Sequence, residues 1–194
     1  MAAPPSDAAT MAPPQPKQSP GATARGITLT ELLITLGIMA ILLALAAPAV
    51  SGVVTRVRIE TSMHLLHSQL SIARNTAITR QVTVRVCPSQ DGLHCSQDSN
   101  WNRRWLMFQA QRQEKHPANP AAILQVTDPP RLPVTAAIRS SIGRRHARFQ
   151  PDGRSGGSNL SICFYERDRP RGRIVINNPG RIRAERTSSP RSCP

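Results

Sequence analysis

The chain has 194 residues, of which 25 are lysine or arginine and 11 are acidic, so its formal net charge is +14. All but two of the basic residues are arginine. A positive surplus of this size favours anionic partners, such as nucleic acid or lipid headgroups. The sequence contains no Gly-x-Ser-x-Gly motif, no glycine-rich phosphate loop and no paired carboxylates, which argues against an enzyme and against a cofactor.

The first segment, residues 1–26, is polar and has six prolines among its first 24 residues. Such a composition cannot bury a core, so we expect this segment to be disordered. Met11 offers a second start for the chain. Beyond the apolar segment that follows, about 140 residues remain, which is enough for one domain with its own core.

A long apolar run over residues 32–54 supplies the roughly 20 residues that a helix needs to cross a bilayer. Lys17 and Arg25 precede the run, so the positive-inside rule predicts that the N-terminus stays in the cytoplasm. Glu31 is the only ionisable side chain within residues 27–55. A carboxylate inside a membrane segment costs about 3 kcal/mol, so we expect Glu31 to have a partner and a function.

The residues around Gly26 resemble the processing site of type IV pilins and type II secretion pseudopilins. After the glycine and an apolar residue, the matching positions are Thr28, Leu29 and Glu31. In that family a prepilin peptidase cuts after the glycine and N-methylates the new terminus. The resemblance implies a leader of residues 1–26, cleavage between Gly26 and Ile27, and methylation of Ile27, where the family usually has phenylalanine.

The same resemblance gives Glu31 a role in assembly, as the fifth residue of the mature chain. Its carboxylate would pair with the α-amine of Ile27 in a neighbouring subunit, which fixes register in a low-dielectric filament core. An ordinary secretory signal is the alternative, because Ala44-Leu45-Ala46 has the small-x-small pattern of a cleavage site. Cleavage there would leave Ala47 as the first residue.

The helix is expected to cross the membrane with residues 27–53 and to continue as an amphipathic helix over residues 54–80. Apolar residues recur there at an approximately helical spacing. They are Val50, Val53, Val54, Val57, Met63, Leu65, Leu66, Leu70, Ile72, Ala73 and Ala77. His64 and His67 have no third ligand nearby, so we interpret them as surface or boundary residues and expect no metal.

Residues 81–194 are expected to form a β-rich periplasmic domain with a basic C-terminal region. Apolar and polar patterning predicts strands at 81–86, 105–108, 122–126, 134–138, 146–150, 160–165, 173–177 and 181–184. One long helix followed by antiparallel strands is an α+β arrangement, and the resemblance implies the pilin fold, with the helix packed on antiparallel sheets. Trp101 and Trp105 are interpreted as buried residues rather than a stacking platform for bases.

Four cysteines, Cys87, Cys95, Cys163 and Cys193, all follow the membrane segment. An even number in an exported domain indicates two disulfides, with three possible pairings. We favour Cys87–Cys95, which closes a short loop, and Cys163–Cys193, which ties down the C-terminal tail. A metal site is the alternative, although the spacing of the first two cysteines is longer than in zinc motifs.

The C-terminal part is strongly basic, since residues 139–194 contain 13 arginines and four acids. Strand alternation places Arg181 and Arg183 on one face and turns Ile182 toward the core. The element Gly180-Arg181-Ile182-Arg183, with the late Cys193, resembles the FimT branch of the GspH/FimT group of minor pilins and pseudopilins. Members of that branch act in type IV pili and have been linked to DNA binding in natural transformation.

The resemblance therefore implies that Arg181 and Arg183 contact DNA, through phosphates and without sequence preference. Charge and proximity alone add three further candidates, Arg186, Arg171 and Arg173. The alternative is that these arginines form a solvated face or bind neighbours in the filament, because a basic patch is only an electrostatic footprint.

The sequence thus predicts a minor pilin or pseudopilin that joins or primes a type IV pilus. It would span the bacterial inner membrane once, with its C-terminal domain in the periplasm, until it enters the filament. Its partners would be prepilin peptidase, other pilins, the inner membrane and double-stranded DNA. The alternative is a GspH-like tip pseudopilin of a type II secretion system, which has a structural role and does not bind DNA.

Overall fold

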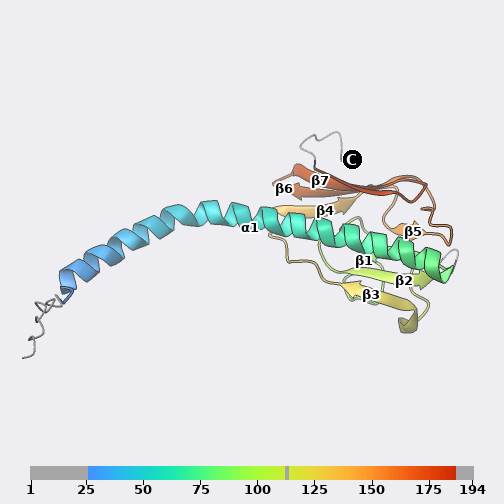
Figure 1. Cartoon of the computed structure of the whole chain (residues 1–194), viewed down its shortest axis with the longest axis horizontal. Coiled ribbons are helices and arrows are strands. Elements are labelled where there is room, and N and C mark those ends of the chain that lie inside the picture. The colour runs from blue at the N-terminus through green and yellow to red at the C-terminus, as the bar shows by residue number, and fades with distance from the viewer. Residues whose placement is uncertain (1–25, 112–113, 187–194) are drawn as a thin grey trace, which may run out of the picture. The chain divides into compact units, whose positions relative to one another are not determined.

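The computed structural model describes residues 26–111 and 114–186 (Figure 1). The chain divides into two units, residues 1–44 and residues 45–194. A single α-helix, α1 (Leu29–Arg80), contributes to both of them. The predicted leader, up to Arg25, and the predicted disulfide partner Cys193 lie outside the described residues.

The first unit contains the start of α1, where Thr28 caps the helix. The backbone N–H of Glu31 donates to Thr28 Oγ1 at 3.3 Å, and the N–H of Leu32 donates to the Thr28 carbonyl at 3.1 Å. Thr28 and Glu31 have the Thr-x-x-Glu spacing of a capping box. The segment Leu29–Ala46 has a mean hydropathy of 2.3 with none of it buried, so it is long and apolar enough to cross a membrane.

In the second unit α1 buries one stripe of its surface. The buried apolar residues follow each other at intervals of three and four, as expected for the core-facing side of a helix. They are Ile59, Met63, Leu66, Leu70, Ala73 and Ala77. The predicted amphipathic stripe was too wide, because Val53, Val57, Leu65 and Ile72 are exposed on the same helix.

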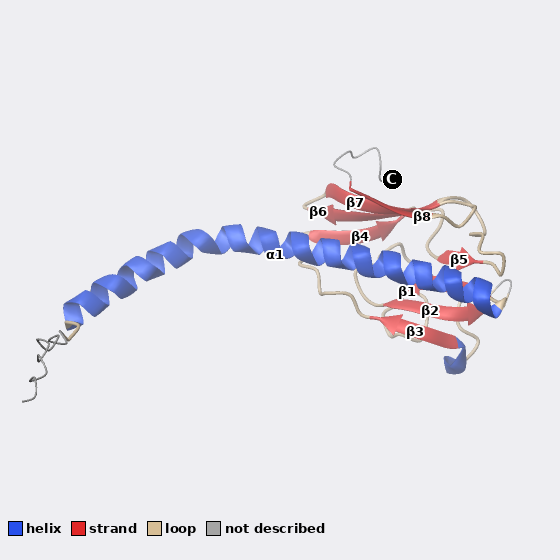
Figure 2. Ribbon diagram, viewed as in Figure 1, coloured by secondary structure: helices blue, strands red, loops and turns tan. Residues whose placement is uncertain are grey.

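Two four-stranded antiparallel sheets complete this unit (Figure 2). In the first sheet the order is β3 (Ile123–Thr127), β2 (Trp105–Ala110), β1 (Thr83–Pro88) and β5 (Ala147–Phe149). In the second it is β4 (Ala136–Ser140), β6 (Leu160–Glu166), β7 (Arg169–Ile176) and β8 (Ile182–Arg186). A short 3₁₀ turn, η1 (Pro120–Ala122), precedes β3. The predicted α+β fold is therefore confirmed.

The strand predictions differ from the structure mainly at β7, which begins at Arg169 rather than at residue 173. A two-residue turn joins β6 to β7, and both its residues, Arg167 and Asp168, have positive φ angles of 48° and 61°. Two successive positive φ values are the mark of a type I′ hairpin turn. Neither residue is glycine, so the turn could not be recognised from a glycine at either position.

One hydrophobic core joins α1 to both sheets. It includes Leu66 and Leu70 of the helix, Phe149 of the first sheet, and Phe164 and Ile174 of the second sheet. Figure 2 shows the second part of α1 running along the two sheets. Burial of apolar side chains in this shared core is what holds α1 and the two sheets together.

Both tryptophans belong to this core, as predicted. Trp101 and Trp105 are fully buried, and Trp105 Nε1 donates to the Trp101 carbonyl at 2.8 Å. Their rings are therefore not available to stack on bases.

A smaller apolar cluster of Cys87, Leu106, Phe108 and Ala110 lies beside a disulfide-closed loop. The predicted Cys87–Cys95 disulfide is present, with 5.6 Å between the two Cα atoms. Within the loop, Asp91 accepts hydrogen bonds from the His94 side chain and from two backbone N–H groups. These hydrogen bonds hold the pKa of Asp91 well below its usual range, and the bond from the His94 side chain has the largest effect.

We predict that replacing both cysteines, Cys87→Ala with Cys95→Ala, lowers the free energy of unfolding by about 2–3 kcal/mol. The disulfide closes a loop with a sequence separation of 8, and a loop of that length loses about this much closure entropy in the unfolded chain. Denaturant unfolding of the oxidised full chain in detergent measures the difference. Equal unfolding curves would mean that the Asp91 hydrogen bonds alone hold the loop.

Candidate functional site

The basic element predicted from the sequence forms the turn between β7 and β8. In the register of this hairpin, Ile176 faces Ile182 across the strands. The N–H of Gly180 donates to the Asn177 carbonyl at 2.8 Å, and the N–H of Arg181 donates to Asn177 Oδ1 at 2.9 Å. The Asn177 N–H in turn donates to the Arg181 carbonyl at 3.2 Å. The backbone of Arg181 is therefore held on both sides by Asn177.

Gly180 is needed at this turn for two reasons. Its φ angle of +81° is in the left-handed region, and a Cβ added there would collide with the Gly153 carbonyl oxygen. The turn thus lies directly against the loop around Gly153. Arg74 Nε of α1 donates to that same carbonyl at 3.1 Å, and the Ser155 N–H donates to the Asn178 carbonyl at 2.9 Å. A glycine at this position lets the turn dock on the loop and on the end of α1.

The two arginines that the resemblance singled out both point to solvent. Arg181 and Arg183 are exposed, while Ile182 between them is partly buried and packs against the core. This confirms the predicted alternation. Among the residues that the structure describes, no side-chain hydrogen bond or ion pair engages either guanidinium.

The other three arginine candidates are each held by a carboxylate. The pairs are Arg171 with Glu166 at 2.6 Å, Arg173 with Glu185 at 2.8 Å, and Arg186 with Glu60 at 3.0 Å. A phosphate would have to displace or share these carboxylates, and Glu166 is buried, so its charge would be costly to leave unpaired. The structure therefore separates these three arginines from Arg181 and Arg183.

The remaining predicted residues lie in other parts of the chain. Gly26 and Ile27 precede α1, and Glu31 is exposed in the first turn of the helix. Cys163 is buried in β6 and is disulfide-bonded, while its predicted partner Cys193 is outside the described range. In the described parts of the chain, no group of three or more histidine, cysteine or acidic residues is arranged to hold a metal ion.

In a comparison with protein families, residues 63–180 match the family described as Type II transport protein GspH. Among solved structures, the type IV minor pilin FimU of Pseudomonas aeruginosa, strain PAO1, is similar in two crystal forms. In space group P21 it has a TM-score of 0.54 and 17% identity, covering 69% of this chain and 92% of FimU. In space group P65 it has a TM-score of 0.50 and 16% identity, covering 67% of this chain and 94% of FimU.

The minor pseudopilin EpsH from the type 2 secretion system of Vibrio cholerae has a TM-score of 0.44 and 13% identity, covering 66% of this chain and 97% of EpsH. No curated protein matches the chain. The FimU similarity supports the fold, which is that of a pilin with a helix packed on antiparallel sheets.

We predict that Gly180→Ala lowers the free energy of unfolding by about 1–3 kcal/mol, the usual cost of a strained backbone position. Both the left-handed φ and the Gly153 carbonyl oppose a Cβ there. Gly143→Ala is the matched control, because no atom lies within 4 Å of its added Cβ, and its effect should stay within about 0.5 kcal/mol. Denaturant unfolding compares the two; equal effects would show that the close approach is unimportant.

Proposed function

Because the chain belongs to the GspH family and is a minor pilin or pseudopilin, we propose that it joins or primes a type IV pilus and binds double-stranded DNA through Arg181 and Arg183. The role in DNA uptake for natural transformation follows from this binding. The observation that carries the proposal is the pair of exposed guanidiniums, for which the described residues provide no carboxylate partner, on a turn whose backbone is fixed.

The chemistry of the turn suits phosphate contact. An arginine guanidinium presents a planar fork of N–H donors that matches two phosphate oxygens. Since the backbone of Arg181 is already held by Asn177 and the turn is docked on Gly153, binding orders little more than the two side chains. Such contacts recognise the DNA backbone rather than the bases, so binding would be independent of sequence.

A second candidate function is a tip pseudopilin of a type II secretion system. The matching family is named for type II transport, and this role needs no affinity for DNA. Arg181 and Arg183 would then contact carboxylates of neighbouring subunits.

For processing and assembly we propose that prepilin peptidase cuts between Gly26 and Ile27 and methylates the new terminus. The leader would then be residues 1–26, the membrane and filament segment residues 27–53, its amphipathic continuation residues 54–80, and the periplasmic domain residues 81–194. The apolar, unburied segment at the start of α1 supports a single span of the inner membrane. The exposure of Glu31 in the first turn leaves its carboxylate available to the Ile27 amine of a neighbour.

We predict that Arg181→Gln with Arg183→Gln weakens DNA binding and flattens its salt dependence. Each phosphate contact contributes about −0.9 to the slope of log K against log salt, so losing two should reduce the slope by about 1.8. The measurement is duplex binding by the full chain in non-ionic detergent across a salt series, with two unrelated sequences.

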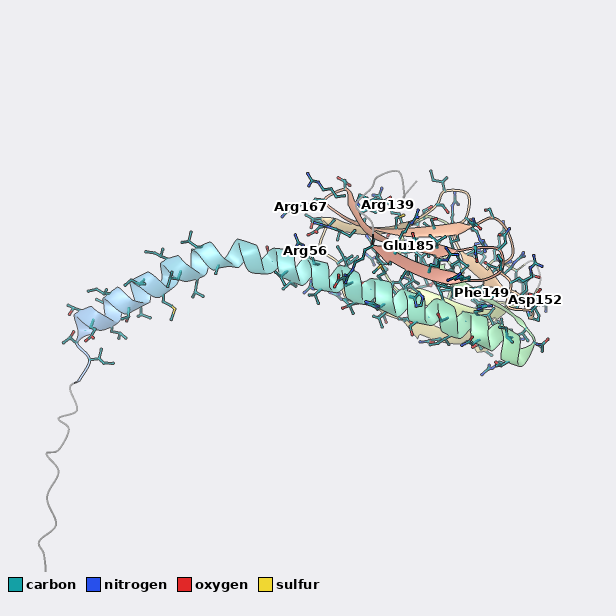
Figure 3. All side chains as sticks on the ribbon, turned by 45° about the horizontal axis from the view of Figure 1, so that its top comes forward. Arg56, Arg139, Phe149, Asp152, Arg167 and Glu185 are labelled. Carbon is teal, nitrogen blue, oxygen red and sulfur yellow. A yellow bond between two sulfur atoms is a disulfide. The ribbon has the colours of Figure 1, made fainter. Side chains whose placement is uncertain are left out.

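The matched control is Arg167→Gln with Arg169→Gln, which removes the same charge from the hairpin between β6 and β7. That hairpin is at the other end of β7, and Figure 3 places Arg167 and Asp152 at opposite ends of the second unit. The control should bind DNA with nearly the wild-type slope. Equal effects of the two double variants would assign binding to overall charge, and absence of binding at low salt would favour the secretion role.

We also predict that Glu31→Gln is cut after Gly26 as efficiently as the wild type but is lost from sheared filaments. The amide has nearly the shape of the carboxylate but cannot form the ion pair with the Ile27 amine. Thr35→Ala, a neutral change on the same exposed part of α1, is the control and should assemble normally. Mass spectrometry of the mature N-terminus checks cleavage, and the filament and membrane fractions check assembly. Assembly of Glu31→Gln at the wild-type level would rule out the pairing.

A further inference from the structure

A cavity of about 540 Å³ lies in the second unit, beside the Cys87–Cys95 disulfide. Four separate stretches of chain surround it: the disulfide loop, residues 115–116, residues 142–148 and residues 156–158. Its wall includes β5, whose position in the first sheet is visible in Figure 1. None of the residues named at the Arg181 turn lines this cavity.

The cavity is lined by positive charge. Its cationic side chains come from two distant segments, and they are Lys115, Arg144, Arg145 and Arg148. Two histidines, His116 and His146, also line it, and none of the described lining residues is an aspartate or glutamate. Four cations around one open space repel each other, and an anion bound between them would offset this repulsion.

A fifth cation stands behind the wall and adds to this repulsion. Arg85 of β1 is 4% exposed and faces Arg148 of β5 directly across the strands. Like charges in opposite cross-strand positions are unfavourable. Glu114 acts on Arg85 and partly offsets its charge, but its Oε2 already accepts a hydrogen bond from the Gln111 N–H at 2.8 Å.

Burial and this crowding of positive charge lower the pKa values of two groups in the cavity. The pKa of His146 is lowered to about 4. Burial is the largest cause, and the nearby positive charges of Arg85, Arg144, Arg148 and Lys115 lower it further. Arg85 Nη1 donates to His146 Nε2 at 2.7 Å, which requires that nitrogen to be unprotonated. Burial and Arg148 also lower the pKa of Arg144 to about 10.

Hydrogen bonds to the cavity walls hold two of these cations in place. Arg144 Nη2 donates to Ser155 Oγ at 2.6 Å, and its Nη1 donates to the Ser158 carbonyl. Arg145 Nη1 donates to the Gln97 carbonyl in the disulfide loop. Lys115 has no hydrogen bond or ion pair with any residue that the structure describes, so its three donors remain available.

We propose that this cavity binds a phosphate group, carried either by free phosphate or by a phosphorylated end of a nucleic-acid strand. Phosphate has the charge to neutralise two of the surrounding cations and the oxygens to accept from lysine and arginine donors together. The site is independent of DNA binding at Arg181 and Arg183, because no side chain is shared between them.

The test is calorimetric titration of the full chain in non-ionic detergent with inorganic phosphate, at constant ionic strength held with chloride. Wild type should bind phosphate saturably. Lys115→Gln with Arg145→Gln should bind it about tenfold more weakly, since two charge-assisted donors are lost. Both of these residues are exposed, and equal unfolding midpoints confirm that the variant is folded.

The matched control, Arg181→Gln with Arg183→Gln, removes the same charge and should bind phosphate as the wild type does. In the wild type, bound phosphate should also raise the pKa of His146, visible in its ring proton NMR signal. Absence of saturable binding, or equal weakening in the two double variants, would overturn the proposal.

Competition identifies the source of the phosphate. A 5′-phosphorylated oligonucleotide that displaces inorganic phosphate better than its unphosphorylated counterpart assigns the site to strand ends. Displacement by neither oligonucleotide assigns it to free phosphate.

Discussion

The second half of α1 is the element on which the whole second unit depends. Each sheet turns an apolar face toward this helix, and the stripe that includes Leu66 and Leu70 forms one core with both of them. Truncating a buried leucine to alanine typically costs about 2–5 kcal/mol, a large share of the total stability of about 5–15 kcal/mol that small domains have. The position of the β7–β8 turn follows from this packing, because Arg74 at the end of the same helix also bonds to the loop beneath that turn.

The distribution of carboxylates decides which arginines remain available. With 11 acids against 25 basic residues, most guanidiniums cannot have a carboxylate of their own. Glu60, Glu166 and Glu185 are each used within the second unit, where they hold strands β7 and β8 to each other or to their surroundings. Net charge alone therefore does not locate a binding surface. The arginines that a ligand can reach are those left over after these structural pairs are formed.

Much of the fold could be predicted from the sequence, because helical and strand periodicity are local patterns. The stripe at Met63, Leu66 and Leu70 and the alternation around Ile182 are examples. What could not be predicted depends on distant residues. Arg186 and its partner Glu60 are 126 positions apart, so the sequence around Arg186 does not reveal the carboxylate that engages it. The cationic cavity likewise combines residues from β1, β5 and four loop segments, none of which has a motif.

The loop that contains Gly153 and Ser155 connects the two cationic surfaces of the second unit. On one side Gly153 touches Gly180, and the Ser155 N–H bonds to the Asn178 carbonyl of the arginine turn. On the other side the Ser155 hydroxyl accepts from Arg144 of the cavity. A short segment is thus packed between two surfaces that share no side chain. Because both surfaces are held through its backbone and one hydroxyl, a change in the shape of this loop would alter them together, even though different arginines would bind the two proposed ligands.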